Sequence, residues 1–125
     1  MKILIVDDSV MDRRLTINLL RKNNVTNDIL EAVDGEEGLE VLSQHYKEIC
    51  LILLDWQMPK MDGIEFMKGV VKVPEVASIP IVMITASGSD DSKREARDAN
   101  PSLAGYVVKP FKPAELLETI QPYLK

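Results

Sequence analysis

Polar residues follow four apolar segments of this chain, each at the point where the segment ends. They are Asp7 and Asp8 after the first segment, Asp55 after the second, Thr85 after the third and Lys109 after the fourth. If the segments are parallel strands, their C-terminal ends lie at one edge of one sheet, which is where open α/β folds bind ligands. Three carboxylates, a hydroxyl and an ammonium would then meet at that edge.

Carboxylates gathered in this way repel one another, and a cation would relieve the repulsion. Mg²⁺ takes oxygen ligands and is usually held by one or two carboxylates together with a phosphate. Asp55 is the best-placed nucleophile, because residues 50–55 are apolar up to the carboxylate and indicate a central, buried strand. A carboxylate that attacks phosphorus forms an aspartyl phosphate. That reaction mainly requires neutralisation of the phosphoryl oxygens, which Mg²⁺ and Lys109 can supply, while the Thr85 hydroxyl can donate a hydrogen bond.

The composition predicts one globular domain over residues 1–125 and disfavours several functions. Hydrophobic residues make up 46% of the chain and charged residues 28%, as in soluble globular proteins. A net charge of −5 disfavours direct binding to nucleic acid, and no apolar run approaches the roughly 20 residues of a membrane span. The single cysteine, Cys50, cannot form an internal disulfide, and the N-terminal residues do not have the pattern of a leader peptide. We therefore expect a cytoplasmic location.

Apolar segments alternate five times with segments of helical periodicity. The predicted strands are residues 2–7, 29–33, 50–55, 81–85 and 104–109. Strict alternation implies an α/β fold with a doubly wound parallel sheet, helices on both faces and right-handed crossovers. We expect a flavodoxin-like sheet of five strands in the order 2-1-3-4-5, flanked by five helices.

Local signals indicate where the helices begin and which faces they bury. Asp34 and Glu37 have the spacing of a capping box for the second helix. The apolar stripe of the first helix is expected to comprise Leu15, Leu19 and Leu20. The fourth helix, roughly residues 90–99, contains few large apolar residues and many charges, which is typical of a solvated face.

The chain resembles the response-regulator receiver domains of two-component signalling. The resemblance rests on Asp7-Asp8, Asp55, Thr85-Ala86 and Lys109-Pro110, in that order at the predicted strand ends. Within the family, residues 55–59, 62–63 and 105–111 are especially similar to the chemotaxis receivers. Each motif alone is weak evidence, but the ordered set is specific and spans the whole chain.

The resemblance implies a Mg²⁺-dependent phosphoryl transfer to Asp55 from a phospho-histidine kinase or a small phosphodonor. Asp8, Asp55 and the backbone carbonyl of Gln57 would ligate the metal, and Asp7 would act mostly through a metal-bound water. Lys109 would pair with the phosphoryl group or, before phosphorylation, with Asp55. The protein would catalyse only its own phosphorylation and dephosphorylation and would not be an enzyme.

The resemblance also implies a switch. Thr85 would move to the phosphoryl group and Tyr106 would turn inward, which changes the face formed by the fourth helix, the fifth strand and the fifth helix. Gln57 and Ser87 correspond to variable positions that tune how water reaches the acyl phosphate. The Lys109–Pro110 peptide bond is expected to be cis. The implied partners of this monomer are a sensor histidine kinase or phosphotransfer protein and a downstream protein that recognises the phosphorylated form.

Two departures leave the pathway open. The stretch from Thr85 to Lys109 is two residues longer than in the chemotaxis receivers and contains Asn100-Pro101. The fourth helix belongs to the output face and is unusually charged. The chain, whether it stands alone or is cut from a longer protein, is therefore expected to act in chemotaxis or as an intermediate phosphorelay carrier without a motor target.

Two other classes of function fit the residues less well. A haloacid-dehalogenase-type phosphatase also uses an aspartyl nucleophile, but it needs a second acid two residues later, where this chain has Gln57, and a cap domain that excludes water. A flavin or nucleotide binder needs a glycine- or hydroxyl-rich loop after the first strand. The loop here carries Asp7 and Asp8, which would repel a bare phosphate.

Overall fold

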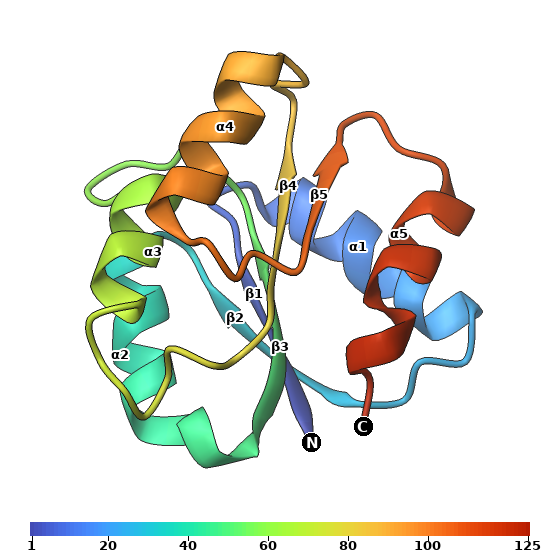
Figure 1. The fold of residues 1–125 in the computed structure, drawn as a ribbon. Helices are drawn as coiled ribbons and strands as arrows, with labels where there is room; N and C mark the ends of the chain where they lie inside the picture. The colour runs from blue at the N-terminus through green and yellow to red at the C-terminus, as the bar shows by residue number, and fades with distance from the viewer.

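The computed structural model describes residues 1–125, which form a single five-stranded sheet between two layers of helices (Figure 1). The strands are β1 (Lys2–Val6), β2 (Asp28–Ala32), β3 (Ile49–Leu54), β4 (Ile81–Thr85) and β5 (Gly105–Val108). All pairings are parallel and the order is β2-β1-β3-β4-β5. The predicted fold class and strand order are confirmed.

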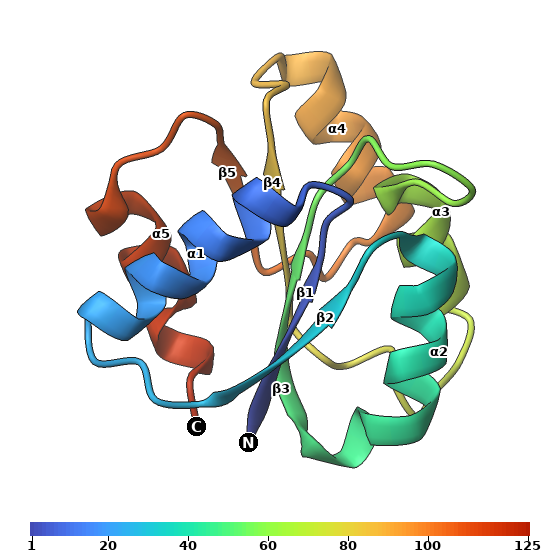
Figure 2. The same cartoon turned by 180° about the vertical axis from the view of Figure 1, so that it is seen from behind.

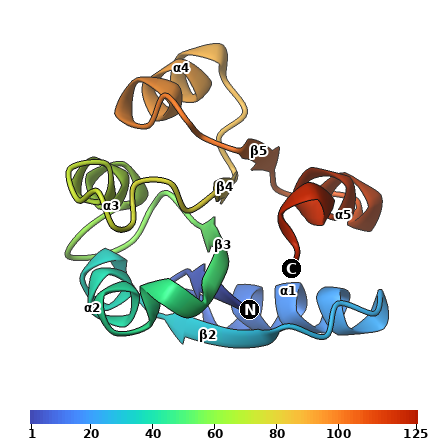
Figure 3. The same ribbon diagram turned by 60° about the horizontal axis from the view of Figure 1, so that its bottom comes forward.

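The helices alternate with the strands along the chain. They are α1 (Val10–Lys22), α2 (Gly35–His45), α3 (Gly63–Val70), α4 (Asp90–Ala99) and α5 (Pro113–Ile120), with 3₁₀ turns at Tyr46–Glu48 and Gln121–Tyr123. Helices α2, α3 and α4 lie on one face of the sheet and α1 and α5 on the other, as Figures 2 and 3 show. Both faces of the sheet are covered because the chain moves across the sheet in one direction from β1 to β2 and in the other from β2 to β5, and right-handed crossovers place these connections on opposite faces.

The central strand explains why the sheet presents its polar residues at one edge. All six residues of β3 are buried, as expected for a parallel strand covered on both faces. In the register of the sheet, Leu54 lies opposite Val6 of β1 and Met83 of β4. The residues that follow these positions therefore emerge side by side.

Each face of the sheet has its own core. On the first face α3 contributes Phe66 and Met67, whereas α4 contributes only Ala96 and Ala99. The second core is closed by side chains of α1 and α5, among them Leu20, Leu116 and Ile120. Cys50 is buried in this second core. It is thus a small core residue, as such cysteines usually are.

The predicted apolar stripe of α1 is wrong at Leu15, which is 62% exposed. The buried residues of this helix are Arg13, Thr16 and Leu20. Arg13 is buried because its guanidinium donates to the backbone carbonyl of Asp7 and, through Nε, to Glu31 at 2.9 Å. A long charged side chain with satisfied donors thus takes a place that periodicity had given to leucine.

The predicted capping box of α2 is half present. Asp34 accepts a hydrogen bond from the backbone N–H of Glu37 at 2.8 Å, but the Glu37 carboxylate accepts from Val33, one residue earlier than a capping box requires. The complete capping box lies at α3 instead, between Asp62 and Glu65. The Lys109–Pro110 peptide bond is cis, as expected.

Candidate functional site

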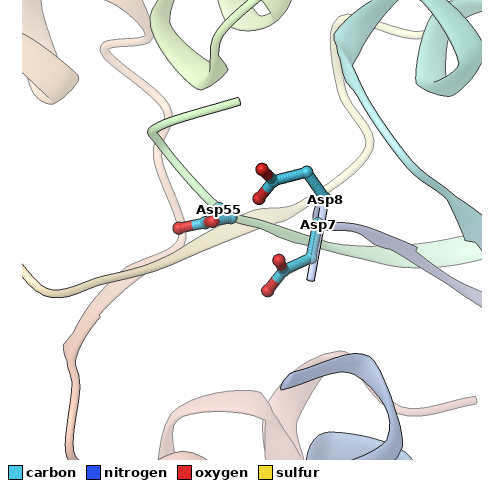
Figure 4. Close-up of side chains that lie close together, drawn as sticks. All are labelled: Asp7, Asp8 and Asp55. Carbon is cyan, nitrogen blue, oxygen red and sulfur yellow. The ribbon is translucent and has the colours of Figure 1, made fainter. Parts of the chain in front are cut away.

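Asp7, Asp8 and Asp55 lie together at the C-terminal ends of β1 and β3, and we call these three residues the acid cluster (Figure 4). One carboxylate oxygen from each residue lies within 4.8 Å of the others. Sheet-type hydrogen bonds continue past the strand ends: the Asp7 N–H donates to Ala32 at 3.0 Å and the Asp55 N–H donates to Val6 at 2.9 Å. These bonds fix the backbone positions of Asp7 and Asp55 at the edge of the sheet. Such a set of oxygen ligands fits a hard divalent cation.

The environment of Asp55 disfavours a bare negative charge. Its side chain is 14% exposed, and its Oδ1 accepts a hydrogen bond from the Trp56 N–H at 2.9 Å. Burial, together with the negative charge of Asp7, raises the pKa of Asp55 from 3.8 to about 6, although Lys109 opposes the shift. Near neutral pH the acid cluster therefore gains free energy from binding a cation.

Lys109 brings one ammonium to several carboxylates. Its Nζ lies 3.0 Å from Asp12, 3.3 Å from Asp7 and 3.8 Å from Asp55. Burial alone would lower the pKa of Lys109, but the hydrogen bond to Asp12 and the charges of Asp55 and Asp7 outweigh it and raise the pKa. Lys109 is therefore a stable cation that pairs with Asp55 as expected, but at a longer distance than with Asp12.

Thr85, Ser87 and Tyr106 are linked by hydrogen bonds next to the acid cluster. Thr85 is buried at the end of β4, and its Oγ1 accepts from the Ser87 N–H at 3.3 Å. The Tyr106 hydroxyl donates to the Ser87 carbonyl at 2.6 Å, and burial raises the pKa of this hydroxyl. Ser87 Oγ also lies 2.6 Å from Ser92 Oγ in α4. The backbone at Ser87 thus connects the end of β4 to both Tyr106 and α4.

Sequence reasoning missed two residues that shape the site. Asp12, in the first turn of α1, is the nearest partner of Lys109; only the fold brings the two together, and no sequence signal links them. Gly63 begins α3 directly against the backbone of the acid cluster, where an added Cβ would lie 2.5 Å from the Asp55 carbonyl oxygen. Residues 62–63 contributed only to the resemblance to the chemotaxis receivers, and the close approach explains why glycine is needed at position 63.

Gln57 is exposed in the loop between β3 and α3, two residues after Asp55. The sheet edge is thus acidic and is flanked by a lysine and a buried threonine.

The five helices are too short or too polar for any of them to span a membrane.

Comparison with known proteins agrees with this geometry. The response regulator receiver domain family matches residues 3–121, so the chain belongs to this family. The chemotaxis protein CheY of Pseudomonas aeruginosa is 40% identical over 121 residues, which is 97% of this chain and 94% of that protein.

Solved structures show the same similarity. The chemotaxis response regulator CheY4 of Vibrio cholerae superimposes with a TM-score of 0.84 at 33% identity, covering 98% of both chains. The phosphorylated cyanobacterial phytochrome response regulator RcpA superimposes with a TM-score of 0.79 at 28% identity, covering 97% of this chain and 89% of that one. The chain is thus a receiver domain of the CheY type. Such domains are signalling proteins that bind Mg²⁺ at an acidic pocket and interact with histidine kinases and downstream targets.

Proposed function

We propose that Asp55 accepts a phosphoryl group in a Mg²⁺-dependent reaction and that the phosphorylated chain binds a downstream protein through the face formed by α4, β5 and α5. The observation that supports this most strongly is the position of Asp55, a largely buried carboxylate between two acidic neighbours and the Lys109 ammonium. Phosphorylation of the similar protein RcpA supports the same chemistry. Residues 1–125 would act as one unit.

The acid cluster and the backbone carbonyl of Gln57 would hold the metal. Asp8 and Asp55 would be direct ligands, whereas Asp7 would act mostly through a water. The bound ion supplies positive charge to the phosphoryl oxygens. It would also remove the repulsion between the three carboxylates, which costs free energy in the metal-free chain.

The transfer itself uses few residues. A carboxylate oxygen of Asp55 attacks phosphorus, the bond from phosphorus to the imidazole nitrogen of the donor breaks, and the imidazole leaves with the bonding pair. Lys109 pairs with the phosphoryl oxygens. Thr85 is suited to donate to them, because its oxygen accepts from the Ser87 N–H and its own hydroxyl hydrogen has no partner among the hydrogen bonds of the structure. Gln57 and Ser87 would tune how water reaches the acyl phosphate.

The same contacts suggest how the change spreads. A Thr85 hydroxyl that moves toward the phosphoryl group lengthens its contact with Ser87, whose carbonyl holds the Tyr106 hydroxyl. Tyr106 would then turn inward and α4 would shift. The phosphoryl group carries roughly −1.5 to −2 charges in place of the single charge of the Asp55 carboxylate, and this change can bias an element with two arrangements.

The proposed partners are a sensor histidine kinase or a phosphotransfer protein and a target that prefers the phosphorylated form, in the cytoplasm and with a monomeric receiver. Similarity to chemotaxis proteins supports a role in chemotaxis. The highly charged α4, whose exposed residues include Asp90, Asp91, Arg94 and Glu95, favours a second candidate, an intermediate phosphorelay carrier without a motor target.

Phosphorylation is tested with acetyl phosphate or phosphoramidate in the presence of Mg²⁺. We expect labelling of the unmodified chain that is lost in Asp55→Asn and on removal of the metal with a chelator. Asp91→Asn, an exposed carboxylate in α4, is the matched control and should label normally. Unchanged labelling of Asp55→Asn would reject Asp55 as the acceptor.

The partner is tested by affinity capture with the beryllofluoride-activated chain. A protein retained by the activated chain and not by Asp55→Asn under the same conditions is the expected target. Capture of a flagellar motor component would support chemotaxis, and capture of a histidine phosphotransfer protein would support the relay. Equal capture by both forms would contradict a phosphorylation-dependent output.

A further inference from the structure

One ammonium serves three carboxylates at this site, and its closest partner lies outside the acid cluster. Lys109 Nζ is 3.0 Å from Asp12, 0.8 Å closer than the 3.8 Å that separates it from Asp55. No other lysine or arginine side chain pairs with Asp7, Asp12 or Asp55. The position of Lys109 is therefore decided by competition between these carboxylates.

Asp12 differs from its competitors in where it lies. It belongs to the first turn of α1, and its side chain is 40% exposed, against 9% for Asp7 and 14% for Asp55. A metal held by the acid cluster would take up the charge of Asp7 and Asp55 but would leave the charge of Asp12 free. When a metal is bound, Asp12 would therefore attract the Lys109 ammonium more strongly than Asp7 and Asp55 do.

The backbone holds Asp12 firmly in this position. Its N–H donates to the Ser9 side chain at 3.1 Å, which caps α1. The next residue, Arg13, is buried and bonded both to the Asp7 carbonyl and to Glu31. The first turn of α1 is thus attached to the end of β1, which keeps the backbone of Asp12 in place if the lysine moves.

Lys109 has room to move. Asp12 and Lys109 both line a groove of about 500 Å³ between α1 and the loop from β5 to α5, together with Leu15, Thr16 and Phe111. A lysine stem has four carbons and a rotatable ammonium. The side chain therefore borders open space on the α1 side of the site, and its ammonium already lies 3.8 Å from Asp55.

We propose that Asp12 is a positioning residue that holds Lys109 on the α1 side of the site and competes with the phosphoryl group for its ammonium. The inference rests on the proposed role of Asp55. It has two consequences of opposite sign: Asp12 disfavours gain of the phosphoryl group, and it favours Mg²⁺ by keeping the ammonium away from Asp55.

The experiment compares Asp12→Asn with the unmodified chain, and repeats the comparison in a Lys109→Ala background. At saturating Mg²⁺ we expect Asp12→Asn to raise the rate of labelling by acetyl phosphate about two- to fivefold, the size expected for a partly exposed ion pair. The affinity for Mg²⁺, followed by the fluorescence of the single tryptophan, Trp56, should fall by a similar factor. Both effects should shrink to less than about 1.5-fold in the Lys109→Ala background.

Two further variants separate positioning from general electrostatics. Asp91→Asn removes a first-turn carboxylate from α4, away from Lys109, and should change neither quantity. Asp12→Glu keeps the charge and should restore most of the original behaviour. Thermal unfolding of each variant distinguishes lost labelling from lost folding.

The outcomes distinguish this inference from the proposed function. Labelling that depends on Asp55 but does not change in Asp12→Asn overturns the inference alone. Equal effects of Asp12→Asn with and without Lys109 also overturn it, because the lysine would then not be involved. Absence of any labelling in the unmodified chain overturns the proposed function and this inference with it.

Discussion

Helices α3 and α4 cover the same face of the sheet, yet they are attached to it in different ways. Five of the eight residues of α3 are buried, including Phe66 and Met67, whereas α4 buries only Ala96 and Ala99. Burial of apolar side chains stabilises a protein by about 25 cal/mol for each Å² removed from water. Helix α3 is therefore held by a large hydrophobic contribution and α4 by a small one.

The first residue of the well-packed helix α3 also contacts the backbone next to the acid cluster. The Gly63 N–H donates to the Trp56 carbonyl at 2.8 Å, and the backbone of Gly63 packs against the carbonyl of Asp55. The first buried residue of α3 thus lies directly against the proposed phosphoacceptor, Asp55. Carboxylates that must keep their geometry under mutual repulsion are placed against the better-packed helix.

Helix α4 is joined to the site mainly by polar contacts. The Ser87–Ser92 hydroxyl contact and the Tyr106–Ser87 hydrogen bond link it to the end of β4, and Lys93 lies 6.0 Å from the centre of the Tyr106 ring. Segments with few buried apolar contacts open and shift at low free-energy cost. The acid cluster therefore lies against the well-packed helix α3, whereas the proposed response involves the lightly attached helix α4.

The largest expected effect on stability comes from Phe66→Ala in α3. Loss of a fully buried ring should lower the free energy of unfolding by about 3–5 kcal/mol, measured by urea denaturation. Hydrogen exchange should then accelerate in α3 as well as in α4. A loss below about 1 kcal/mol would show that α3 is not the firmly held helix.

The next largest effect on stability is expected from removing the charge of Asp55, which lies against α3. In the metal-free folded chain the pKa of Asp55 is raised, chiefly by burial, from 3.8 to about 6. The folded state then binds the proton more tightly than the unfolded state, so the ionised carboxylate destabilises the fold above about pH 6, and this cost disappears below the unfolded pKa. Asp55→Asn should therefore stabilise the metal-free protein by about 3 kcal/mol near pH 8 and very little below about pH 4.

Urea denaturation with a chelator present, at the two pH values, measures this difference. Asp91→Asn in α4 serves as the control and should show no comparable dependence on pH. A stabilisation of Asp55→Asn that is equal at both pH values would contradict an elevated pKa as its cause.

A smaller effect is expected from Ala96→Gly in α4. The substitution removes one buried methyl group and lowers helix propensity, which together amount to about 1–2 kcal/mol. Because α4 is lightly attached, its amide protons should exchange faster while those of α3 stay protected. Equal acceleration in both helices would show that they open as one unit and that the contrast between them does not hold.

The smallest effect should come from Lys93→Ala. The ammonium lies at the outer limit of a cation–π contact with Tyr106, and its removal should cost about 0.5 kcal/mol. The ring should gain freedom to reorient, which NMR of the Tyr106 side chain would detect. A loss of more than about 2 kcal/mol in the free energy of unfolding would mean that the attachment of α4 depends strongly on the Lys93–Tyr106 contact.

The sequence pattern predicts the sheet and the residues of the acid cluster. Five apolar segments separated by helical periods imply a doubly wound parallel sheet, for which the flavodoxin-like order 2-1-3-4-5 is one of the two common orders. Parallel strands bring the residues after Val6 and Leu54 to the same edge. The type and order of Asp7, Asp8, Asp55, Thr85 and Lys109 then indicated the receiver family. Local patterns suffice here because the periods that mark strands and helices lie within short segments, and their strict alternation implies parallel strands.

The partners of those residues depend on how the helices pack on the sheet. Asp12 and Lys109 are far apart in the sequence, and the long lysine stem can reach any of three carboxylates, so the choice depends on how α1 sits on the sheet. The exposure of Leu15 has the same origin, because a buried Arg13 sets the rotation of α1 through bonds to Asp7 and Glu31. Helical periodicity shows that a helix has a core-facing side, but the identity of that side is set by contacts between elements distant along the chain.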